Sequence, residues 1–187
     1  AAEGLLAETP VHILINNTGG PPPGWMKDTD PAQFTEAFQQ HIINYHQLAL
    51  TCLPAMQEAG YGRIINIVST SVRIPIHRLG VSNTIRAATA SWAKTLANEW
   101  GQYNITVNNI LPGYTETARL EALVENNARM QQTSVENVKA QMTANIPLRR
   151  FGKPGEIAAV AGFLASPAAS YVNGVSIPVD GGSTGTI

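Results

Sequence analysis

The sequence predicts an α/β fold in which helices cover both faces of a parallel sheet. Short, β-branched apolar runs alternate strictly with helical segments along the chain, and this order favours right-handed crossovers between parallel strands. Three of the runs also lack the regular change between apolar and polar residues that a half-exposed strand shows. The 187 residues suit a single domain, 1–187, that buries a substantial core.

Four runs are the expected strands, and each is brief and rich in β-branched residues. We expect the first three to be buried on both faces of the sheet. The fourth contains Pro178, which cannot donate a hydrogen bond to a neighbouring strand, so this run is expected at an edge. The runs are Val11–Ile15, Arg63–Val68, Ile105–Leu111 and Val175–Val179.

The first long helix is expected to begin at Asp30. This residue is a suitable N-cap, Pro31 occupies the first helical position, and Gln33 is placed as a capping-box partner. Apolar residues then recur at helical spacing, and Pro54 is expected to kink the helix before it ends near Gly60.

Two further helices and one polar excursion follow. The helices are expected at about Ser82–Trp100, ended by Gly101, and at Pro154–Ala165. Residues 117–145 are polar, with only weak apolar periodicity. Long insertions after strand ends often carry substrate lids, so we interpret 117–145 as a mobile helical lid.

Charge and cysteine content exclude several classes of function. Lys and Arg (12) nearly balance Asp and Glu (13), giving a net charge of −1, so no surface for nucleic acid or an anionic membrane is expected. The single Cys52 excludes an internal disulfide and a multi-cysteine metal site, as is typical of a cytoplasmic protein. No cluster has metal-ligand spacing, and no apolar stretch approaches the ~18 residues that span a membrane. Only 13% of residues are charged, about half the usual ~25%, which favours a homo-oligomer.

Polar and glycine-rich segments directly follow three of the expected strands. Open parallel sheets bind ligands at the carboxyl ends of their strands, so these segments are the first candidates for a site. They are Asn16–Gly20, Ser69–Ser71 and Pro112–Thr117.

Motifs along almost the whole chain resemble those of the short-chain dehydrogenase/reductase superfamily, nearest to its 3-oxoacyl-[acyl-carrier-protein] reductase-like branch. Asn16-Asn-Thr-Gly19 is similar to the family's NNAG turn, and Gly62–Ser69 to the strand that ends in the catalytic serine. Val107-Asn108 and Pro112-Gly113 match the VN…PG element. C-terminal segments repeat the family signature in order and spacing: Arg150–Pro154, Glu156-Ile157, Phe163–Ser166, Tyr171–Gly174 and Val179–Gly182.

The resemblance implies a Rossmann-like doubly wound sheet, and NAD(P)-dependent reduction of a small-molecule carbonyl or oxidation of an alcohol. It assigns Ser69 to polarising the substrate carbonyl. NADP or NAD would be bound by residues of three segments: Asn16, Thr18, Gly19, Pro112, Gly113 and Thr117. Members of the family pair their long helices in dimers and tetramers, so a homodimer or homotetramer is expected.

The chain departs from the family pattern at the proton donor. The family's tyrosine and lysine positions, thirteen and seventeen residues after the serine, fall on Ser82 and Arg86. An aliphatic hydroxyl is too weak an acid to replace a phenol, and an arginine stays charged at any working pH. At i and i+4 of one helix, these side chains face the same way and can hydrogen-bond or clamp an anionic or carbonyl group. The family's asparagine position falls on His41, either a proton relay or a buried histidine with a structural role.

The family's first strand, Gly-rich turn and helix, which bind the cofactor pyrophosphate, do not precede Val11 in this sequence. We therefore expect the sequence to be part of a longer polypeptide, in which Val11–Ile15 is the edge of an incomplete sheet and the longer form binds the cofactor. An oxidoreductase with an atypical active site is the first hypothesis. The alternative is a catalytically impaired relative that acts as a binding or assembly subunit.

Overall fold

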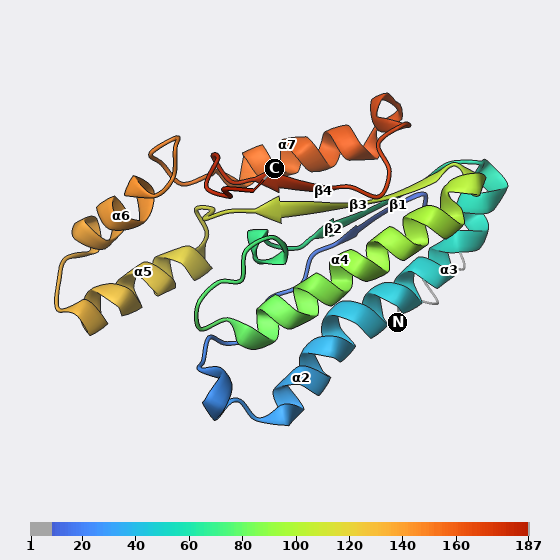
Figure 1. Cartoon of the computed structure of the whole chain (residues 1–187). Helices are drawn as coiled ribbons and strands as arrows, with labels where there is room; N and C mark the ends of the chain where they lie inside the picture. The colour runs from blue at the N-terminus through green and yellow to red at the C-terminus, as the bar shows by residue number, and fades with distance from the viewer. Residues whose placement is uncertain (1–8, 187) are drawn as a thin grey trace.

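The structure, a computed structural model, describes residues 9–186, and in this part four parallel strands form one sheet in the order β1-β2-β3-β4. Helices connect successive strands (Figure 1). The predicted α/β class with a parallel sheet is therefore confirmed. The strands are β1 (Ile13–Asn16), β2 (Gly62–Ile67), β3 (Ile105–Pro112) and β4 (Ser176–Val179).

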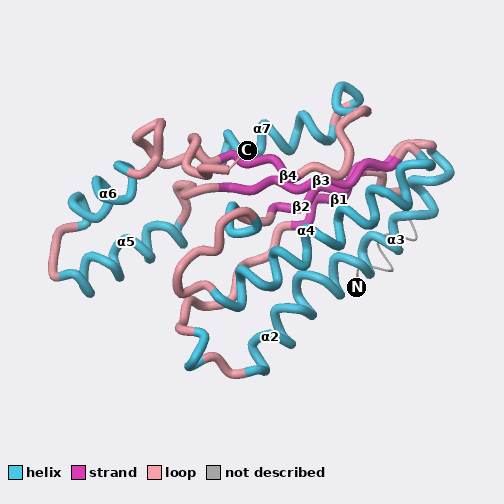
Figure 2. Tube along the Cα trace, in the orientation of Figure 1, coloured by secondary structure: helices cyan, strands magenta, loops and turns pink. Residues whose placement is uncertain are grey.

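The helices lie close to the predicted segments, and the one at 154–165 has the predicted bounds. A π-helical turn, Gln39–Ile43, joins the first two, and Figure 2 shows loops leading from β1 and β2 to the helices that follow them. The α-helices of the described residues are α2 (Pro31–Phe38), α3 (Asn44–Ala59), α4 (Gly80–Trp100), α5 (Ala118–Gln131), α6 (Val135–Ala144) and α7 (Pro154–Ala165).

Two apolar cores fill the two faces of the sheet. On one face α3 and α4 bury Ile64 of β2 together with Leu96 of α4. On the other face α7 buries Ile110 of β3 together with Leu164. Figure 1 shows α4 and α7 on opposite sides of the strands. This arrangement buries β2 and β3 on both faces, as their uninterrupted apolar sequences predict.

The first strand differs from the prediction of burial on both faces. Ile13 and Ile15 are 43% and 50% exposed, whereas Leu14 packs into the core beneath α3 and α4. Successive side chains of a strand point to opposite faces, and on the side of Ile13 and Ile15 the helix α7 lies over β2 and β3 instead. The expectation of an edge strand at each end is confirmed, because β1 and β4 are the outer strands.

A ladder of side-chain hydrogen bonds crosses the whole sheet. Asn16, Asn66, Asn109 and Ser176 occupy one register row of the four strands. Asn16 Nδ2 donates to Asn66 Oδ1 at 2.8 Å, Asn66 Nδ2 to Asn109 Oδ1 at 2.9 Å, and Asn109 Nδ2 to Ser176 Oγ at 3.0 Å. All three asparagines are buried. The ladder fixes the alignment of the strands next to their carboxyl ends.

The first helix begins as predicted but its cap differs in detail. Asp30 is the N-cap, and its carboxylate accepts a hydrogen bond from the Ala32 backbone N–H at 2.9 Å. The predicted capping box with Gln33 is not formed. The helix α3 continues through Pro54 and ends at Gly60, whose φ of +57° suits glycine.

The helix α4 ends at Trp100 with Gly101 as its C-cap, as predicted. Gly101 keeps right-handed helical angles and continues into a 3-10 turn. The left-handed residue that ends this segment is Asn104, with φ of +60°, and Asn104 is a residue type that tolerates this conformation. The predicted end of the helix at Gly101 is therefore confirmed, and Asn104 ends only the 3-10 turn that follows it.

The predicted helical excursion at 117–145 is confirmed as the pair α5 and α6. The two helices share a small core of their own, which includes Leu120, Val124 and Val138. Figure 1 shows the pair beyond the arrowheads of β3 and β4. The excursion therefore lies at the edge of the sheet where a ligand is expected, and its role as a lid stays a prediction.

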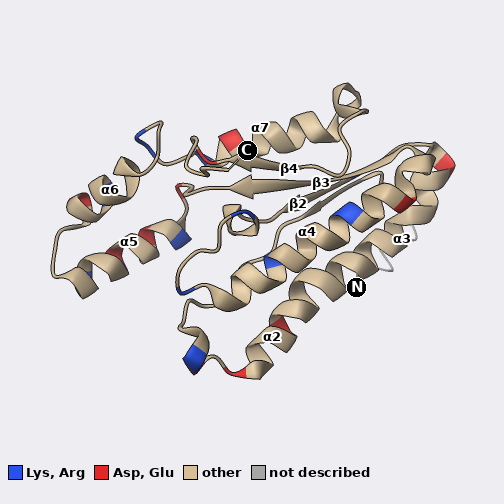
Figure 3. Cartoon of the chain, in the orientation of Figure 1, with Lys and Arg blue, Asp and Glu red and all other residues tan. Residues whose placement is uncertain are grey.

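The helices α3 and α4, which cover one face of the sheet, carry few charged side chains (Figure 3). Glu58 is the only charged residue of α3, and Leu50 of the same helix is 48% exposed. Across residues 9–186, no helix combines the length and the apolar character that crossing a membrane requires.

Candidate functional site

A cleft of about 240 Å³ opens at the carboxyl ends of the strands. Its walls come from the segments that follow β2, β3 and β4, where parallel sheets bind ligands. Its lining combines serine and threonine hydroxyls with aliphatic side chains. The lining residues are Ser69, Thr70, Ile74, Pro75, Ile76, Pro112, Gly113, Tyr114, Ser183 and Thr184. Three predicted site residues, Ser69, Pro112 and Gly113, are therefore brought together.

Ser69 is positioned by the end of strand β2. It has extended backbone angles and caps the 3-10 turn Thr70–Val72, with its Oγ accepting from the Ser71 backbone N–H at 3.1 Å. This bond leaves the Ser69 hydroxyl proton available to a ligand, because the oxygen accepts and does not donate. The hydroxyl can therefore donate to a carbonyl oxygen in the cleft.

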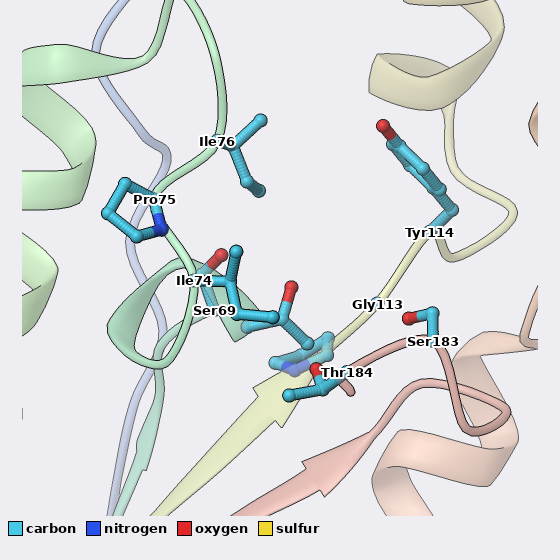
Figure 4. A pocket seen from close by; sticks show the side chains of 10 residues that line it. Ser69, Ile74, Pro75, Ile76, Gly113, Tyr114, Ser183 and Thr184 are labelled. Carbon is cyan, nitrogen blue, oxygen red and sulfur yellow. The ribbon is translucent and has the colours of Figure 1, made fainter. Parts of the chain in front are cut away.

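Tyr114 is a cleft residue that the sequence analysis did not single out. It directly follows Pro112-Gly113 and lies across the cleft from Ile76 (Figure 4). Its ring packs edge-on against Phe151 at 6.2 Å between centroids. The signal was its place immediately after a strand-end Pro-Gly pair, a position where a large side chain reaches the crevice above the sheet.

Ser183 and Thr184 were also missed, because the end of the fourth strand was not examined as a ligand site. A tight turn holds them, in which the Asp180 carboxylate accepts from Gly182 N at 2.9 Å, Ser183 Oγ at 3.1 Å and Thr184 N at 2.8 Å. Burial acts to raise the pKa of Asp180, but these hydrogen bonds outweigh it and lower the pKa. Asp180 therefore stays ionised and keeps the turn in place.

His41 and Thr18 meet in a second group of polar side chains, outside the lining of the cleft. Thr18 Oγ1 is hydrogen-bonded to His41 Nδ1 at 2.8 Å and to the Tyr45 hydroxyl at 2.7 Å. His41 is 1% exposed, and its Nε2 has no hydrogen-bond partner among the described residues. The structure therefore bonds two predicted site residues, His41 and Thr18, directly to each other and adds the Tyr45 hydroxyl to the group.

Ser82 and Arg86 bond to each other, as their spacing predicts. Arg86 Nε donates to Ser82 Oγ at 3.3 Å, and Arg86 Nη1 donates to the Val68 carbonyl at 2.6 Å. Ser82 is 6% exposed and does not line the cleft. Arg86 is thus anchored to the residue that precedes Ser69, behind the cleft wall.

The remaining predicted cofactor residues, Asn16, Thr117 and Gly19, lie outside the cleft lining, and the first two have structural hydrogen bonds. Asn16 is 3% exposed and belongs to the asparagine ladder. Thr117 is exposed and caps α5, with Oγ1 accepting from Leu120 N at 3.4 Å. Gly19 is exposed, and no atom lies within 4 Å of where a Cβ would be. Neither Thr117, Gly19 nor Asn16 lines the cleft.

The environment of His41 holds its imidazole neutral. Burial lowers its pKa from 6.5 to about 4, the positive charge of Arg86 acts in the same direction, and the Gly19 carbonyl opposes them. A neutral imidazole can pass a proton between its two nitrogens, whereas a charged one beside Arg86 would be costly.

The pKa of His41 predicts a loss of stability in mild acid. The unfolded chain binds a proton near pH 6.5 and the folded chain near 4, so the stabilisation is complete above about 6.5 and is lost as the pH falls towards 4. The wild type is expected to lose about 2–3 kcal/mol of unfolding free energy between pH 7 and 4.5 through His41, and His41→Gln should lack this loss. Denaturant unfolding at both pH values measures it. His77→Gln, a change at an exposed histidine, is the matched control for loss of an imidazole. An equal change in unfolding free energy between the two pH values in the wild type and His41→Gln would contradict the prediction.

The chemistry of the cleft fits one end of a nicotinamide cofactor with a small substrate. Its volume of about 240 Å³ lies below the ~300–1,000 Å³ of pockets that enclose a whole drug-sized ligand. A lining that combines hydroxyl donors with apolar side chains suits a flat amide-bearing ring. Among the described residues, no three His, Cys, Asp or Glu side chains come together as a metal site.

Comparison with known proteins identifies the family. The model of a family described as "Enoyl-(Acyl carrier protein) reductase" matches residues 6–184. The NADPH-dependent reductase BacG of Bacillus subtilis is 33% identical over 177 residues, covering 95% of this chain and 68% of the relative. The 3-oxoacyl-[acyl-carrier-protein] reductase MabA of Mycobacterium bovis is 32% identical over 173 residues, covering 92% and 66%.

A solved structure has the same fold. The crystal structure of YwfH, an NADPH-dependent reductase involved in bacilysin biosynthesis, superposes with a TM-score of 0.93 at 31% identity, over 99% of this chain and 72% of that one. The chain spans about two thirds of the length of its curated relatives. The motifs, the sheet and the comparisons agree, and the chain belongs to the short-chain dehydrogenase/reductase superfamily of oxidoreductases.

Proposed function

We propose that the protein is an NAD(P)-dependent oxidoreductase that reduces a small carbonyl compound with NAD(P)H or, in the reverse reaction, oxidises the corresponding alcohol with NAD(P)+. The observation that carries this proposal is the position of Ser69, whose hydroxyl lines a cleft at the carboxyl ends of the strands. The relatives that are named as NADPH-dependent reductases favour NADPH over NADH. The cofactor supplies the hydride, and the protein supplies orientation, polarisation and a proton.

The Ser69 hydroxyl would donate a hydrogen bond to the substrate carbonyl oxygen and so polarise the carbonyl. Pro112 and Gly113 would position the nicotinamide end of the cofactor in the same cleft. Asn16 at the end of β1, Thr18 and Gly19 in the loop that follows, and the α5 cap Thr117 would complete the cofactor contacts.

Ser82 and Arg86 would stand where relatives keep the tyrosine and lysine of proton transfer, with His41 as the relay. Support comes from the bond between Arg86 Nε and Ser82 Oγ and from the neutral His41 nearby. A serine is a poor general acid, and losing a positioned general acid typically costs ~10²–10⁴ in rate. Slow turnover is therefore part of the proposal.

Turnover of NADPH with a panel of aldehydes, ketones and oxo acids tests the proposal. Loss of NADPH absorbance that depends on both protein and carbonyl supports it. If calorimetry shows that NADPH binds but no carbonyl is reduced, the alternative function gains support, a binding or assembly subunit. The burial of Ser82, at 6% exposure, favours this alternative, because a side chain that does not line the cleft is poorly placed to give a proton to a substrate there.

We propose that the protein forms a homodimer or homotetramer and that α2 and α3 lie in the interface. Phe38 and Leu50 are 43% and 48% exposed there, and Glu58 is the only charge on α3. We expect Leu50→Glu to convert the oligomer to monomers, because a carboxylate cannot be buried without a partner. Light scattering coupled to size exclusion measures the mass. Leu148, 61% exposed in the loop before α7, changed to Glu, is the control, and a monomeric wild type would overturn the proposal.

The cytoplasm is the proposed compartment. The single cysteine, Cys52, is buried and forms no disulfide, as expected of a reducing environment.

A further inference from the structure

Two arginines from different helices converge on Gly20. Arg86 extends from α4, and Arg119 is the second residue of α5. A Cβ on Gly20 would lie 2.8 Å from Arg119 Nη1 and 3.3 Å from Arg86 Nη2. Both guanidinium groups therefore reach the same small space, and the absence of a side chain at residue 20 keeps that space open.

Arg86 is held rigidly but keeps one nitrogen without a partner. Its side chain is buried, with the residue 8% exposed, while Nε donates to Ser82 and Nη1 to the Val68 carbonyl. Within residues 9–186, no hydrogen bond uses Nη2, the nitrogen nearest Gly20. A guanidinium anchored in this way is oriented in advance for a ligand, so little entropy is lost on binding.

Among residues 9–186, no carboxylate forms an ion pair with either guanidinium group. The ion pairs between described side chains are Lys27–Asp28 and Arg150–Glu156. The hydrogen bond from Arg119 Nη2 to the Pro21 carbonyl is long, at 3.5 Å, and holds the guanidinium group weakly. Burial lowers the pKa of Arg86, Tyr45 acts in the opposite direction, and the charge of Arg119 lowers it further. Two neighbouring cations without an acidic partner leave a positive potential at Gly20.

We propose that Arg86 and Arg119 form a binding site for an oxyanion, a carboxylate or phosphate group, over Gly20. Guanidinium groups bind both kinds of oxyanion through paired N–H donors. Arg86 is bonded to Val68, the residue before Ser69, so the anion would lie beside the reacting carbonyl. The anionic group would belong either to the substrate, as in an oxo acid, or to the cofactor phosphates. Binding of an oxyanion by the two arginines does not depend on the proposed function. The assignment of that oxyanion to a substrate or to the cofactor rests on the proposed function.

Calorimetric titration with inorganic phosphate and with malonate tests the site without any turnover. We expect Arg119→Gln to weaken both affinities at least tenfold, and Arg119→Lys to weaken them less, because lysine keeps the charge but not the paired donors. Gly20→Ala should also weaken binding, since its methyl group fills the space between the guanidinium groups. Arg129→Gln is the matched control, an exposed arginine near the other end of α5.

Two further comparisons of the wild type and Arg119→Gln show whether the anionic group belongs to the substrate or to the cofactor. If the anion is on the substrate, the variant raises KM for an oxo acid but not for its methyl ester, and NADPH affinity is unchanged. If it is on the cofactor, the variant weakens NADPH binding, and phosphate competes with NADPH. Equal affinity of Arg119→Gln and wild type for phosphate and malonate would overturn the proposal, as would no binding of either anion to the wild type at millimolar concentrations.

Discussion

Replacing Asn66 by alanine is expected to lower the free energy of unfolding by about 3–5 kcal/mol. Asn66 is fully buried, and its amide bonds both to Asn16 and to Asn109. The substitution leaves the Asn16 donor and the Asn109 acceptor buried without partners, and each such group costs roughly 1–3 kcal/mol. Chemical denaturation with the fitted slope held in common measures the change.

Asn17→Ala is the matched control, because Asn17 is an exposed asparagine on the neighbouring loop. Its effect should stay within about 0.5 kcal/mol. A double-mutant cycle of Asn16→Ala with Asn66→Ala sharpens the test, since bonded partners are expected to give non-additive losses. A loss below about 1 kcal/mol for Asn66→Ala, or strict additivity in the cycle, would contradict a role for the ladder in holding the strands together.

Ser69→Ala is expected to reduce kcat by roughly 10²–10³-fold in the reduction of a carbonyl substrate. The hydroxyl is the donor proposed to act on the carbonyl oxygen, and removing one such donor typically has an effect of this size. The same change also removes the cap on Ser71 N at 3.1 Å, which costs only about 1 kcal/mol of stability. Steady-state kinetics at saturating NADPH, with thermal unfolding beside it, separates the two effects.

Ser134→Ala controls for the lost cap. Ser134 caps α6 through a hydrogen bond from Asn137 N to its Oγ at 3.1 Å, the same kind of contact as at Ser69, and it does not line the cleft. We expect similar destabilisation and unchanged kcat. Comparable kcat values for Ser69→Ala and the wild type would remove Ser69 from the mechanism.

The site was only partly accessible from sequence. Ser69, Pro112 and Gly113 were predicted to lie together, because they follow strands of one parallel sheet, and they do line one cleft. Tyr114 was missed, since nothing in its local sequence says that its ring turns towards the loop before α4. Ser82 was predicted in the site, but it is buried against Arg86 and does not line the cleft.

The meeting of Arg119 with Arg86 is also beyond any sequence pattern. The two residues are separated by strand β3, and the contact depends on how α5 leaves the sheet. The hydrogen bond of Thr18 to both His41 and Tyr45 has the same origin, because the π-helical turn Gln39–Ile43 sets the rotation of α3. One inserted residue per turn rotates the following helix, and local propensities do not reveal it.

The sequence by itself determined the α/β class, the parallel strands, most helix boundaries and the family. These properties follow from local periodicity, from capping residues and from ordered motifs, all of which are written over short stretches of chain. Only the tertiary structure decided that β1 is half exposed, that three asparagines form a ladder, and which side chains enter the cleft. Those outcomes depend on contacts between residues distant in the chain, where packing and the pairing of buried polar groups select one arrangement from many.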